Sequence, residues 1–354
     1  MKKSQNKKVA LGMSGGVDSS VSAYLLKKEG FDVTGVYMQC WDSKADGCRA
    51  DEDRSDALKV ATSLGIPFKS LDFRNEYNQR VIDYFYKEYE SGRTPNPDVM
   101  CNKEIKFGLF FKWALENNFD FVATGHYARN EEKDSKFNLL VGKDVNKDQS
   151  YFLYQLNQEI LAKTLFPIGD FTKTQIREIA EELNLFTKSK PESMGICFIG
   201  EVNIKDFLMK RLPIKQGEVV DLNGEVIGEH EGIWFYTIGQ RHGFKLSKYF
   251  GIPLYVVGKN VEKNQIIVGF IKDTSKSEFY ATDLNFISDL PEEEKEYSFR
   301  IRHLGEFYKG KIEFITKEKL KISLSTDAFG VAEGQSAVIY DGDVVLGGGI
   351  ISLS

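Results

Sequence analysis

Cysteine is scarce in this chain: 354 residues contain only four, Cys40, Cys48, Cys101 and Cys197. Four cysteines over this length are too few for a disulfide framework, so we expect them to be reduced. Any cysteine that matters should then act through its chemistry rather than as a cross-link. Cys40 and Cys48 have no matching pair of His or Cys residues nearby. Neither a zinc site nor an iron–sulfur cluster is therefore expected.

Long hydrophobic runs are also missing. No stretch approaches eighteen apolar residues, and the basic N-terminus (residues 1–8) is followed by a short apolar run that ends in glycines. We therefore expect neither a membrane span nor a secretory signal, and we predict a cytoplasmic protein. The 42% hydrophobic and 28% charged residues favour two or three globular units. A net charge of −5 argues against a uniformly basic surface but permits a local positive face.

The first 130 residues alternate short apolar runs with helical patterns. Strands are expected at 9–13, 33–38, 68–73 and 121–124, and helices at 19–28, 54–64 and around Leu109 and Trp113. Repeated strand–helix units of this kind predict an α/β fold with a doubly wound parallel sheet. Ligands of such sheets bind beyond the carboxyl ends of the strands.

The pattern changes after about residue 143. Thr172 can cap a helix that runs to about Leu183, and residues 188–201 are typical of a connection. Beyond residue 215, short strands alternate with turn pairs such as Asn223-Gly224, as in small β-barrels. We therefore expect a catalytic α/β domain over residues 1–200, a central β-rich linking domain over 201–275 and a C-terminal β-barrel domain over 276–354.

A loop rich in glycine and serine separates the first strand from the first helix: Gly12-Met13-Ser14-Gly15-Gly16-Val17-Asp18-Ser19-Ser20. Glycines let backbone N–H groups turn toward an anion, and the helix N-terminus adds its positive dipole end. The loop lacks the Gly-Lys-Ser/Thr ending of a Walker loop and the spacing of dinucleotide folds. It resembles instead the pyrophosphate loop of ATP pyrophosphatases, which attack the α-phosphorus of ATP and release pyrophosphate. A simple turn in which Asp18 caps the helix is the alternative.

Two residues near this loop have further expected roles. Asp18 is placed to hold Mg²⁺ against the phosphates of ATP, because carboxylate and phosphate oxygens commonly share that ion. Met38 stands at the carboxyl end of the second strand, where folds of this type place the adenine. Ordinary packing in the core is the alternative for Met38.

Two other segments contain the cysteines most open to chemistry. In residues 94–103 (TPNPDVMCNK), Cys101 falls near a helix start, where the helix dipole favours a thiolate. Asp98 can accept and donate protons there, although its negative charge alone would raise the pKa of the Cys101 thiol. In residues 193–200 (SMGICFIG), glycines around Cys197 suggest a segment that moves. Burial as a small hydrophobic residue is the alternative for each cysteine.

A family resemblance emerges when these motifs are taken in order. It is carried by GMSGGVDSS (12–20), TPNPDVMCN (94–102), ATGHYAR (123–129), KDQSYFL (147–153), GICFIG (195–200), HEG (230–232), YTIGQR (236–241) and EGQ (333–335). Together they resemble the bacterial tRNA-specific 2-thiouridylases, which belong to the ATP pyrophosphatase superfamily. The resemblance covers nearly the whole chain. It implies a nucleotide-binding domain like the adenine nucleotide alpha hydrolases, followed by two small β-rich domains.

The resemblance also implies an activity, a sulfur transfer to the wobble uridine (position 34) of tRNA. ATP would adenylate the C2 oxygen of the uracil, and a persulfide on Cys197 would deliver sulfur to that carbon, with release of AMP and pyrophosphate. Cys101 would be the nucleophile that helps discharge the sulfur and can form a disulfide with Cys197, and Asp98 the acid/base. A bound persulfide is a nucleophile already in position. We expect the two thiols to converge at the nucleotide edge of the sheet.

Binding residues follow from the same resemblance. The nucleotide site would contain Gly12, Met13, Ser14, Gly15, Gly16, Val17, Asp18, Ser19, Met38 and Gly125. The target base would meet Asn96, Pro97 and Asp98, and the tRNA would contact His126, Lys147, Asp148, Gln149, Arg302, His303 and Gln335. The expected partners are the anticodon stem–loop of tRNA and a protein donor of persulfide sulfur, with the enzyme itself a monomer.

Some features leave alternatives open. Before Cys197 the family more often has Asp-Ser-Thr-Gly, where this chain has Glu192-Ser193-Met194-Gly195, and His303-Leu304 follows Arg302 where a second arginine is common. A group of basic residues could follow RNA phosphates or simply form a solvated surface: Lys188, Lys190, Lys205, Lys210, Arg211 and Lys215.

Rival functions are another pyrophosphate-loop enzyme, such as an amidotransferase or a lysidine-forming ligase, and a non-catalytic ATP-binding or RNA-binding module.

Overall fold

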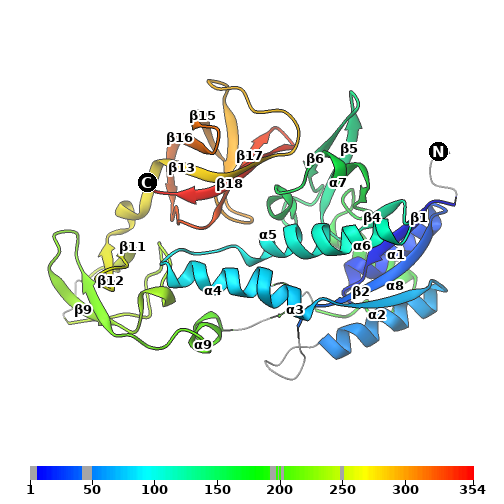
Figure 1. Cartoon of the computed structure of the whole chain (residues 1–354), viewed down its shortest axis with the longest axis horizontal. Helices are drawn as coiled ribbons and strands as arrows, with labels where there is room; N and C mark the ends of the chain where they lie inside the picture. Colours follow the sequence, from blue (N-terminus) through cyan, green and yellow to red (C-terminus); the bar gives the residue numbers. More distant parts are fainter. Residues whose placement is uncertain (1–5, 42–49, 192–196, 198, 201–202, 248–250) are drawn as a thin grey trace.

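The structure of the chain is a computed structural model that describes residues 6–41, 50–191, 197, 199–200, 203–247 and 251–354. Cys48 and most of the segment expected to move, residues 193–196 and 198, lie outside these ranges. Figure 1 shows a parallel sheet at one end of an elongated molecule, a small β unit at the other end, and a barrel beside the helices that run between them. Among the described residues, no helix is long and apolar enough to cross a bilayer.

The N-terminal sheet has five parallel strands in the order β3-β2-β1-β4-β7. The chain leaves β1 for β2 and β3 on one side and later returns to β4 and β7 on the other, so the order reverses beside β1. This confirms the predicted doubly wound sheet. The strands are β1 (Lys8–Gly12), β2 (Asp32–Gln39), β3 (Phe68–Asp72), β4 (Phe121–Ala123) and β7 (Thr164–Leu165).

Helices cover both faces of this sheet, because successive strand residues point to opposite sides. Val9 and Leu11 pack with residues of α1 and α2, whereas Ala10 and Val36 pack against the helices of residues 74–116. A Thr172–Gln175 capping box starts the expected helix α8. The helices of this part are α1 (Val17–Lys28), α2 (Ala50–Leu64), α3 (Arg74–Tyr77), α4 (Asp83–Glu90), α5 (Pro97–Cys101), α6 (Phe111–Glu116), α7 (Gln158–Ala162), α8 (Lys173–Glu182) and α9 (Ile204–Met209).

Two of these helical stretches contain a wider turn. The π-helix η1 (Asn78–Ile82) joins α3 to α4, and the π-helix η2 (Asn102–Phe110) joins α5 to α6. A π-helix places residues five apart nearly over one another, whereas an α-helix turns them to different sides. A short 3₁₀-helix, η3 (Ser150–Leu153), follows later in the chain.

The central unit is a five-stranded sheet in the order β10-β9-β8-β12-β11. Its pairs are antiparallel except for β8 and β12, and its core contains Val219, Ile227 and Val256. Its elements are β8 (Gly217–Val220), β9 (Val226–His230), β10 (Lys245–Leu246), β11 (Tyr255–Asn260), β12 (Gln265–Gly269), η4 (Ile233–Phe235) and η5 (Ile271–Thr274).

The C-terminal unit is a closed barrel of six strands. The strands follow the order β13-β16-β15-β14-β17-β18, and pairing of β13 with β18 closes the ring. The predicted barrel is therefore confirmed. Its strands are β13 (Ser275–Phe286), β14 (Tyr297–Arg300), β15 (Tyr308–Thr316), β16 (Lys319–Phe329), β17 (Ser336–Asp341) and β18 (Val344–Ser352).

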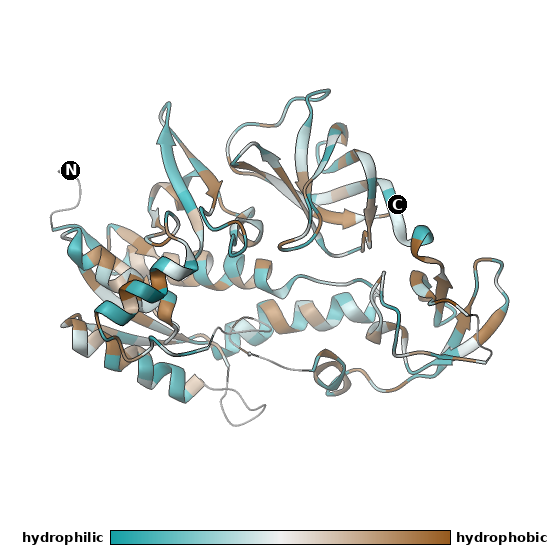
Figure 2. Cartoon of the chain, turned by 180° about the vertical axis from the view of Figure 1, so that it is seen from behind, coloured by the Kyte–Doolittle hydropathy of each residue, from teal (hydrophilic) through white to brown (hydrophobic). Residues whose placement is uncertain are grey.

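A hairpin that the sequence did not predict joins the first unit to this barrel. Strands β5 (Ala128–Lys133) and β6 (Lys136–Val141) pair with each other, and β6 continues onto β18 through Leu139 and Leu140. In Figure 2 one strand of this hairpin is hydrophilic along its length, in accord with the polar sequence of β5. Because β5 carries little apolar alternation, its sequence gives no strand signal.

A buried ion pair reinforces the same junction. The Asp148 carboxylate lies 2.6 Å from Arg300 Nη1, with side chains 1% and 7% exposed. Asp148 also accepts hydrogen bonds from the backbone N–H groups of Gly142 and Ser150. The pair therefore holds the segment after the hairpin against β14.

Neutralising Asp148 should loosen this junction. Asp148→Asn would leave the Arg300 charge buried without its partner, and we expect the free energy of unfolding to fall by about 3–5 kcal/mol. The matched control is Asp343→Asn, which removes the exposed partner of Arg129 at the same junction and should cost about 0–1 kcal/mol. Denaturant unfolding of both variants measures the difference, and equal losses would contradict the assignment.

Candidate active site

The glycine loop turns tightly between β1 and α1. Gly15 has φ of +76°, and a Cβ there would lie 2.2 Å from the carbonyl oxygen of Asp53, so only glycine fits. Ser14 N donates to Ser19 Oγ at 3.3 Å, and Ser19 Oγ donates in turn to the Gly16 carbonyl at 3.2 Å. The predicted phosphate loop therefore stands at the carboxyl end of β1, with its serines gathered at the start of α1.

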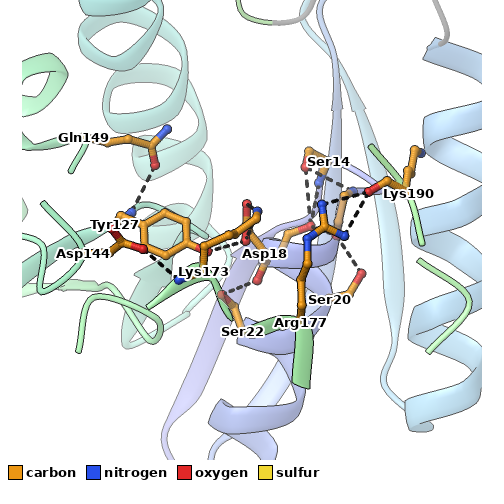
Figure 3. Close-up of polar contacts among 12 residues, drawn as sticks. Ser14, Asp18, Ser20, Ser22, Tyr127, Asp144, Gln149, Lys173, Arg177 and Lys190 are labelled. Carbon is orange, nitrogen blue, oxygen red and sulfur yellow. Dashed lines mark hydrogen bonds and ion pairs between the residues drawn. The ribbon is translucent and has the colours of Figure 1, made fainter. Parts of the chain in front are cut away.

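Two lysines reach this loop from later parts of the chain (Figure 3). Lys173, at the start of α8, bonds both carboxylate oxygens of Asp18 at 2.8 Å. Lys190 donates to the Gly15 carbonyl at 3.0 Å and pairs with Asp53 at 2.7 Å and Asp56 at 2.8 Å. Desolvation acts to raise the pKa of Asp56, but the hydrogen bond and the charge of Lys190 lower it. Both ammonium groups lie where a polyphosphate would need positive charge.

Asp18 does not cap α1. The N-cap is Gly16, with no side-chain cap bond, and the Asp18 carboxylate also accepts a hydrogen bond from Tyr127 Oη at 2.8 Å. The alternative of a simple capping role is therefore wrong. The described residues contain no group of three His, Cys, Asp or Glu side chains arranged to hold a metal.

Gly125 brings the end of β4 against the start of α1. A Cβ on Gly125 would lie 2.9 Å from the backbone nitrogen of Ser19 and 3.1 Å from the carbonyl carbon of Asp18. Met38, predicted near the adenine, is 5% exposed and lies in the hydrophobic cluster that also contains Cys40 and Cys101. This placement agrees with the alternative of core packing for Met38.

The two cysteines lie side by side. Cys101 Sγ is 3.5 Å from Cys197 Sγ, and both thiols are free. The backbone N–H of Cys197 donates to Asp98 Oδ1 at 3.0 Å, and Tyr77 Oη donates to the Cys197 carbonyl at 2.6 Å. The two thiols therefore lie close to each other, with Asp98 beside them; their approach to the nucleotide stays a prediction.

A lysine that sequence reasoning missed completes this cluster. Lys106 Nζ lies 3.3 Å from His126 Nε2, and the Lys106 charge acts on the Cys197 sulfur. Lys106 follows Cys101 by five residues. In an α-helix two residues at this spacing point to different sides, but in the π-helix η2 they lie on the same side. No local sequence signal announced that wider turn.

The two sulfurs differ in their protonation. Burial raises the pKa of Cys101 well above its ordinary value, so this side chain stays a thiol. The hydrogen bond from Cys101 lowers the pKa of Cys197, and the Lys106 charge adds to this effect against the cost of desolvation. The thiolate expected at Cys101 from the helix dipole is therefore wrong, because the same helix buries that sulfur. Cys197 is the more acidic thiol.

The C-terminal barrel holds the segment that leads into Cys101. Gln335 Nε2 donates to the carbonyls of Thr94 and Pro95, each at 3.0 Å, and Thr94 N donates to the Glu333 carbonyl at 2.8 Å. Asn96 then caps α5 by accepting from Val99 N at 3.3 Å, and Pro97 is the first residue of that helix. The residues predicted to meet the target base thus stand between the barrel and the cysteine pair.

Most of the other residues predicted to contact tRNA are buried or have partners within the chain. His126 and Asp148 are buried, at 6% and 1% exposed, and Asp148 is taken up by Arg300. Gln149 accepts a hydrogen bond from Tyr127 N, Arg302 donates to the Phe329 carbonyl, and His303 packs on Phe152 at 4.2 Å between ring centres. Lys147 is half-buried. Their contacts with RNA stay predictions.

Several of the basic residues that could have followed RNA phosphates are paired with acids instead. Lys188 pairs with Glu181, Lys190 with Asp53 and Asp56, Lys205 with Glu231, and Arg211 with Asp83. The pairs of Lys188, Lys205 and Arg211 favour the alternative of a solvated surface for these three residues. Lys190 is the exception in position, because it reaches the glycine loop.

Comparison with known families divides the chain into three matched segments. Residues 7–201 match the tRNA methyl transferase HUP domain, residues 205–270 the tRNA methyl transferase PRC-barrel domain, and residues 276–351 the aminomethyltransferase beta-barrel domain. Among solved structures, the U34-tRNA thiolase NcsA from Methanococcus maripaludis, with its [4Fe-4S] cluster, is 22% identical with a TM-score of 0.37, over 59% of this chain and 68% of that one. NMN synthetase from Francisella tularensis is 17% identical with a TM-score of 0.33, over 53% and 67%.

Curated relatives are similar over almost their whole length. The tRNA-specific 2-thiouridylase MnmA of Bacillus cytotoxicus is 46% identical over 97% of this chain and 94% of the relative. That of Staphylococcus saprophyticus is 46% identical over 97% and 95%, and MnmA 1 of Geobacillus kaustophilus is 47% identical over 98% and 96%. With this identity along its full length, and with the glycine loop and paired cysteines in place, the chain belongs to the tRNA-specific 2-thiouridylase family.

Proposed function

We propose that this tRNA sulfurtransferase replaces the C2 oxygen of the wobble uridine (position 34) with sulfur, using ATP to activate the oxygen and a persulfide on Cys197 to deliver the sulfur. The observation that carries the proposal is the cysteine pair: two free sulfurs 3.5 Å apart, one held as a thiol and the other more acidic. Family membership at 46% identity supports the tRNA substrate.

The glycine loop is proposed to bind the phosphates. Its backbone N–H groups and the start of α1 would face them, with Lys173 and Lys190 able to move from their carboxylate partners to the added negative charge. Asp18 would hold Mg²⁺, since this ion takes only one or two protein carboxylates and completes its shell with phosphate and water. The bound ion would neutralise charge on the phosphates. Activation converts a poor leaving oxygen into AMP.

Sulfur transfer is proposed to use both cysteines. The outer sulfur of the Cys197 persulfide attacks C2, and the C2–O bond breaks with its electron pair leaving on AMP. The Cys101 sulfur, after giving its proton to Asp98 or water, attacks Cys197 Sγ, forms a disulfide and leaves the transferred sulfur on C2 with the electron pair. The disulfide requires the sulfurs to close from 3.5 Å to about 2.05 Å. An external thiol reductant then restores both cysteines.

Asp98 suits the acid/base role in this scheme. Desolvation raises the pKa of its carboxyl, against the effects of the Cys197 backbone N–H and of Lys106. A carboxyl whose pKa is raised is better able to accept a proton and return it. The proposed partners remain a tRNA anticodon stem–loop and a protein that donates persulfide sulfur, acting on a cytoplasmic monomer.

Methyl transfer is the second candidate, because two of the matched family descriptions name it. Methyl transfer to RNA requires no pair of adjacent thiols, and neither do the amidotransferases or lysidine-forming ligases with similar loops. The pairing of Cys101 with Cys197 therefore favours thiolation.

Serine at either cysteine should abolish product without abolishing activation. In Cys197→Ser and Cys101→Ser we expect 2-thiouridine formation to fall by about 10³-fold or more, because a nucleophile is lost. ATP-dependent release of pyrophosphate should persist in Cys197→Ser. Mass spectrometry of tRNA nucleosides, after incubation with ATP and a labelled persulfide, measures the product.

The control for this experiment is Cys40→Ala, which removes a buried thiol from the hydrophobic cluster that also contains Cys101. It should retain thiolation. Wild-type product from either serine variant would remove that cysteine from the mechanism.

Removing the Asp18 carboxylate should stop the activation step. In Asp18→Ala, Lys173 and Tyr127 lose their shared partner, and we expect ATP-dependent pyrophosphate release to drop by about 10²-fold or more. Asp120→Asn is the matched control: Asp120 precedes β4 at the opposite end of the sheet and pairs with Lys7. Unchanged release in Asp18→Ala would refute the phosphate-site assignment.

A further inference from the structure

Lys106 occupies a position that packing does not explain. Lys106 lies on the π-helix η2, five residues after Cys101 and therefore on the same side, and its charge interacts with those of Cys197, Cys101 and Asp98. Desolvation acts to lower the pKa of Lys106, but the neighbouring Cys197, Cys101 and Asp98 together raise it above the ordinary value. A lysine in such a place stays charged.

His126 fixes the direction of this ammonium. Nε2 of the ring lies 3.3 Å from Lys106 Nζ, and Nδ1 lies 2.8 Å from Thr124 Oγ1. Burial and the Lys106 charge lower the pKa of His126 well below its usual value, so the ring is neutral. Nε2 must then accept from the ammonium, and Nδ1 carries the proton and donates to Thr124. The ring thus acts as a fixed acceptor at the end of β4.

In the part of the chain that the structure describes, the ionisable groups named as acting on Cys197 include no cation besides Lys106. Asp98 and Cys101 face it from α5, Tyr77 from α3, and Cys40 from the end of β2, with Lys106 from η2. Burial raises the pKa of Tyr77 and of Cys40 well above their ordinary values, so both are neutral. Within this group, Lys106 is the residue that can balance a negative sulfur.

We propose that Lys106 is a catalytic residue that keeps the Cys197 sulfur anionic, and that His126 is the positioning residue that holds its ammonium in place. The proposal deepens the proposed function and rests on it, since Cys197 is there the carrier of sulfur. The assignment gives His126 an inward role in place of, or alongside, the predicted contact with RNA.

The step that needs this charge is the loading of sulfur. The Cys197 thiolate attacks the outer sulfur of a donor persulfide R–S–SH, and a new S–S bond forms between Cys197 and that sulfur. The donor S–S bond breaks, and its electron pair leaves as the thiolate RS⁻. The proton of the persulfide stays on the transferred sulfur, so the products are Cys197–S–SH and RS⁻. A neutral thiol would attack far more slowly, because the thiolate is the nucleophile.

The rate at which iodoacetamide alkylates Cys197, followed against pH by mass spectrometry of its peptide without ATP or tRNA, tests this proposal. In Lys106→Met we expect the midpoint of the rate profile to move to higher pH by about one unit or more, because the opposite charge is lost. His126→Gln should move it less in the same direction. Lys106→Arg, which keeps the charge, should restore most of the wild-type profile.

The matched control is Lys103→Met, three residues earlier on the same helix, where the lysine faces Asp283 at 4.0 Å. Its profile should match that of the wild type. An unchanged midpoint in Lys106→Met overturns the proposal. If circular dichroism shows that Lys106→Met is unfolded, Lys106→Gln and His126→Gln decide, and no movement in either overturns it. Thiolation by Cys197→Ser would instead refute the sulfur-carrier role and leave the alkylation result standing.

Discussion

The close approach of Gly125 to the start of α1 is the contact on which both halves of the site depend. No Cβ fits there, so the end of β4 lies directly against Asp18 and Ser19. The next residue, His126, bonds Lys106, whose charge acts on Cys197, and the residue before, Thr124, bonds the other nitrogen of the His126 ring. Three consecutive residues therefore join the phosphate loop to the sulfur site. A shift of this turn would move both together.

A few neighbouring residues also connect the barrel to the cysteine site. The turn around Gln335 bonds the backbone of Thr94 and Pro95, just before the helix that carries Asp98 and Cys101. The position of the cysteine helix relative to the barrel is therefore set by the Gln335 side chain, which bonds main-chain carbonyls just before that helix. A nucleic acid bound to the barrel and to this segment would meet a fixed spacing between them.

Sequence patterns predicted much of this structure because the relevant signals are local. The glycine loop, the four early strands, the Thr172 cap and the barrel each depend on neighbouring residues, and the structure contains all of them. The proximity of Cys101 and Cys197 came from the family resemblance and not from spacing.

What the sequence did not predict depends on distant partners or unusual turns. The strand β5 has a mostly charged sequence and exists because β6 pairs with the barrel. Lys106 lies on the same side as Cys101 because residues 102–110 form a π-helix, and Lys173 reaches Asp18 across 155 positions. The dipole argument for a Cys101 thiolate failed because burial outweighed it. The roles of the predicted tRNA-binding residues depend on a partner whose contacts no local pattern specifies.

The pairing of β6 with β18 also has a consequence for biosynthesis. Leu140 pairs with Val344, 204 positions later (344 − 140). A ribosome adding 5–20 residues per second would expose the open edge of β6 for about 10–40 s before its partner emerges. Closing so long a loop is slow, and an open strand edge invites pairing with other nascent chains. The charged strand β5 pairs with the opposite edge of β6, so only one edge of β6 is open during that interval.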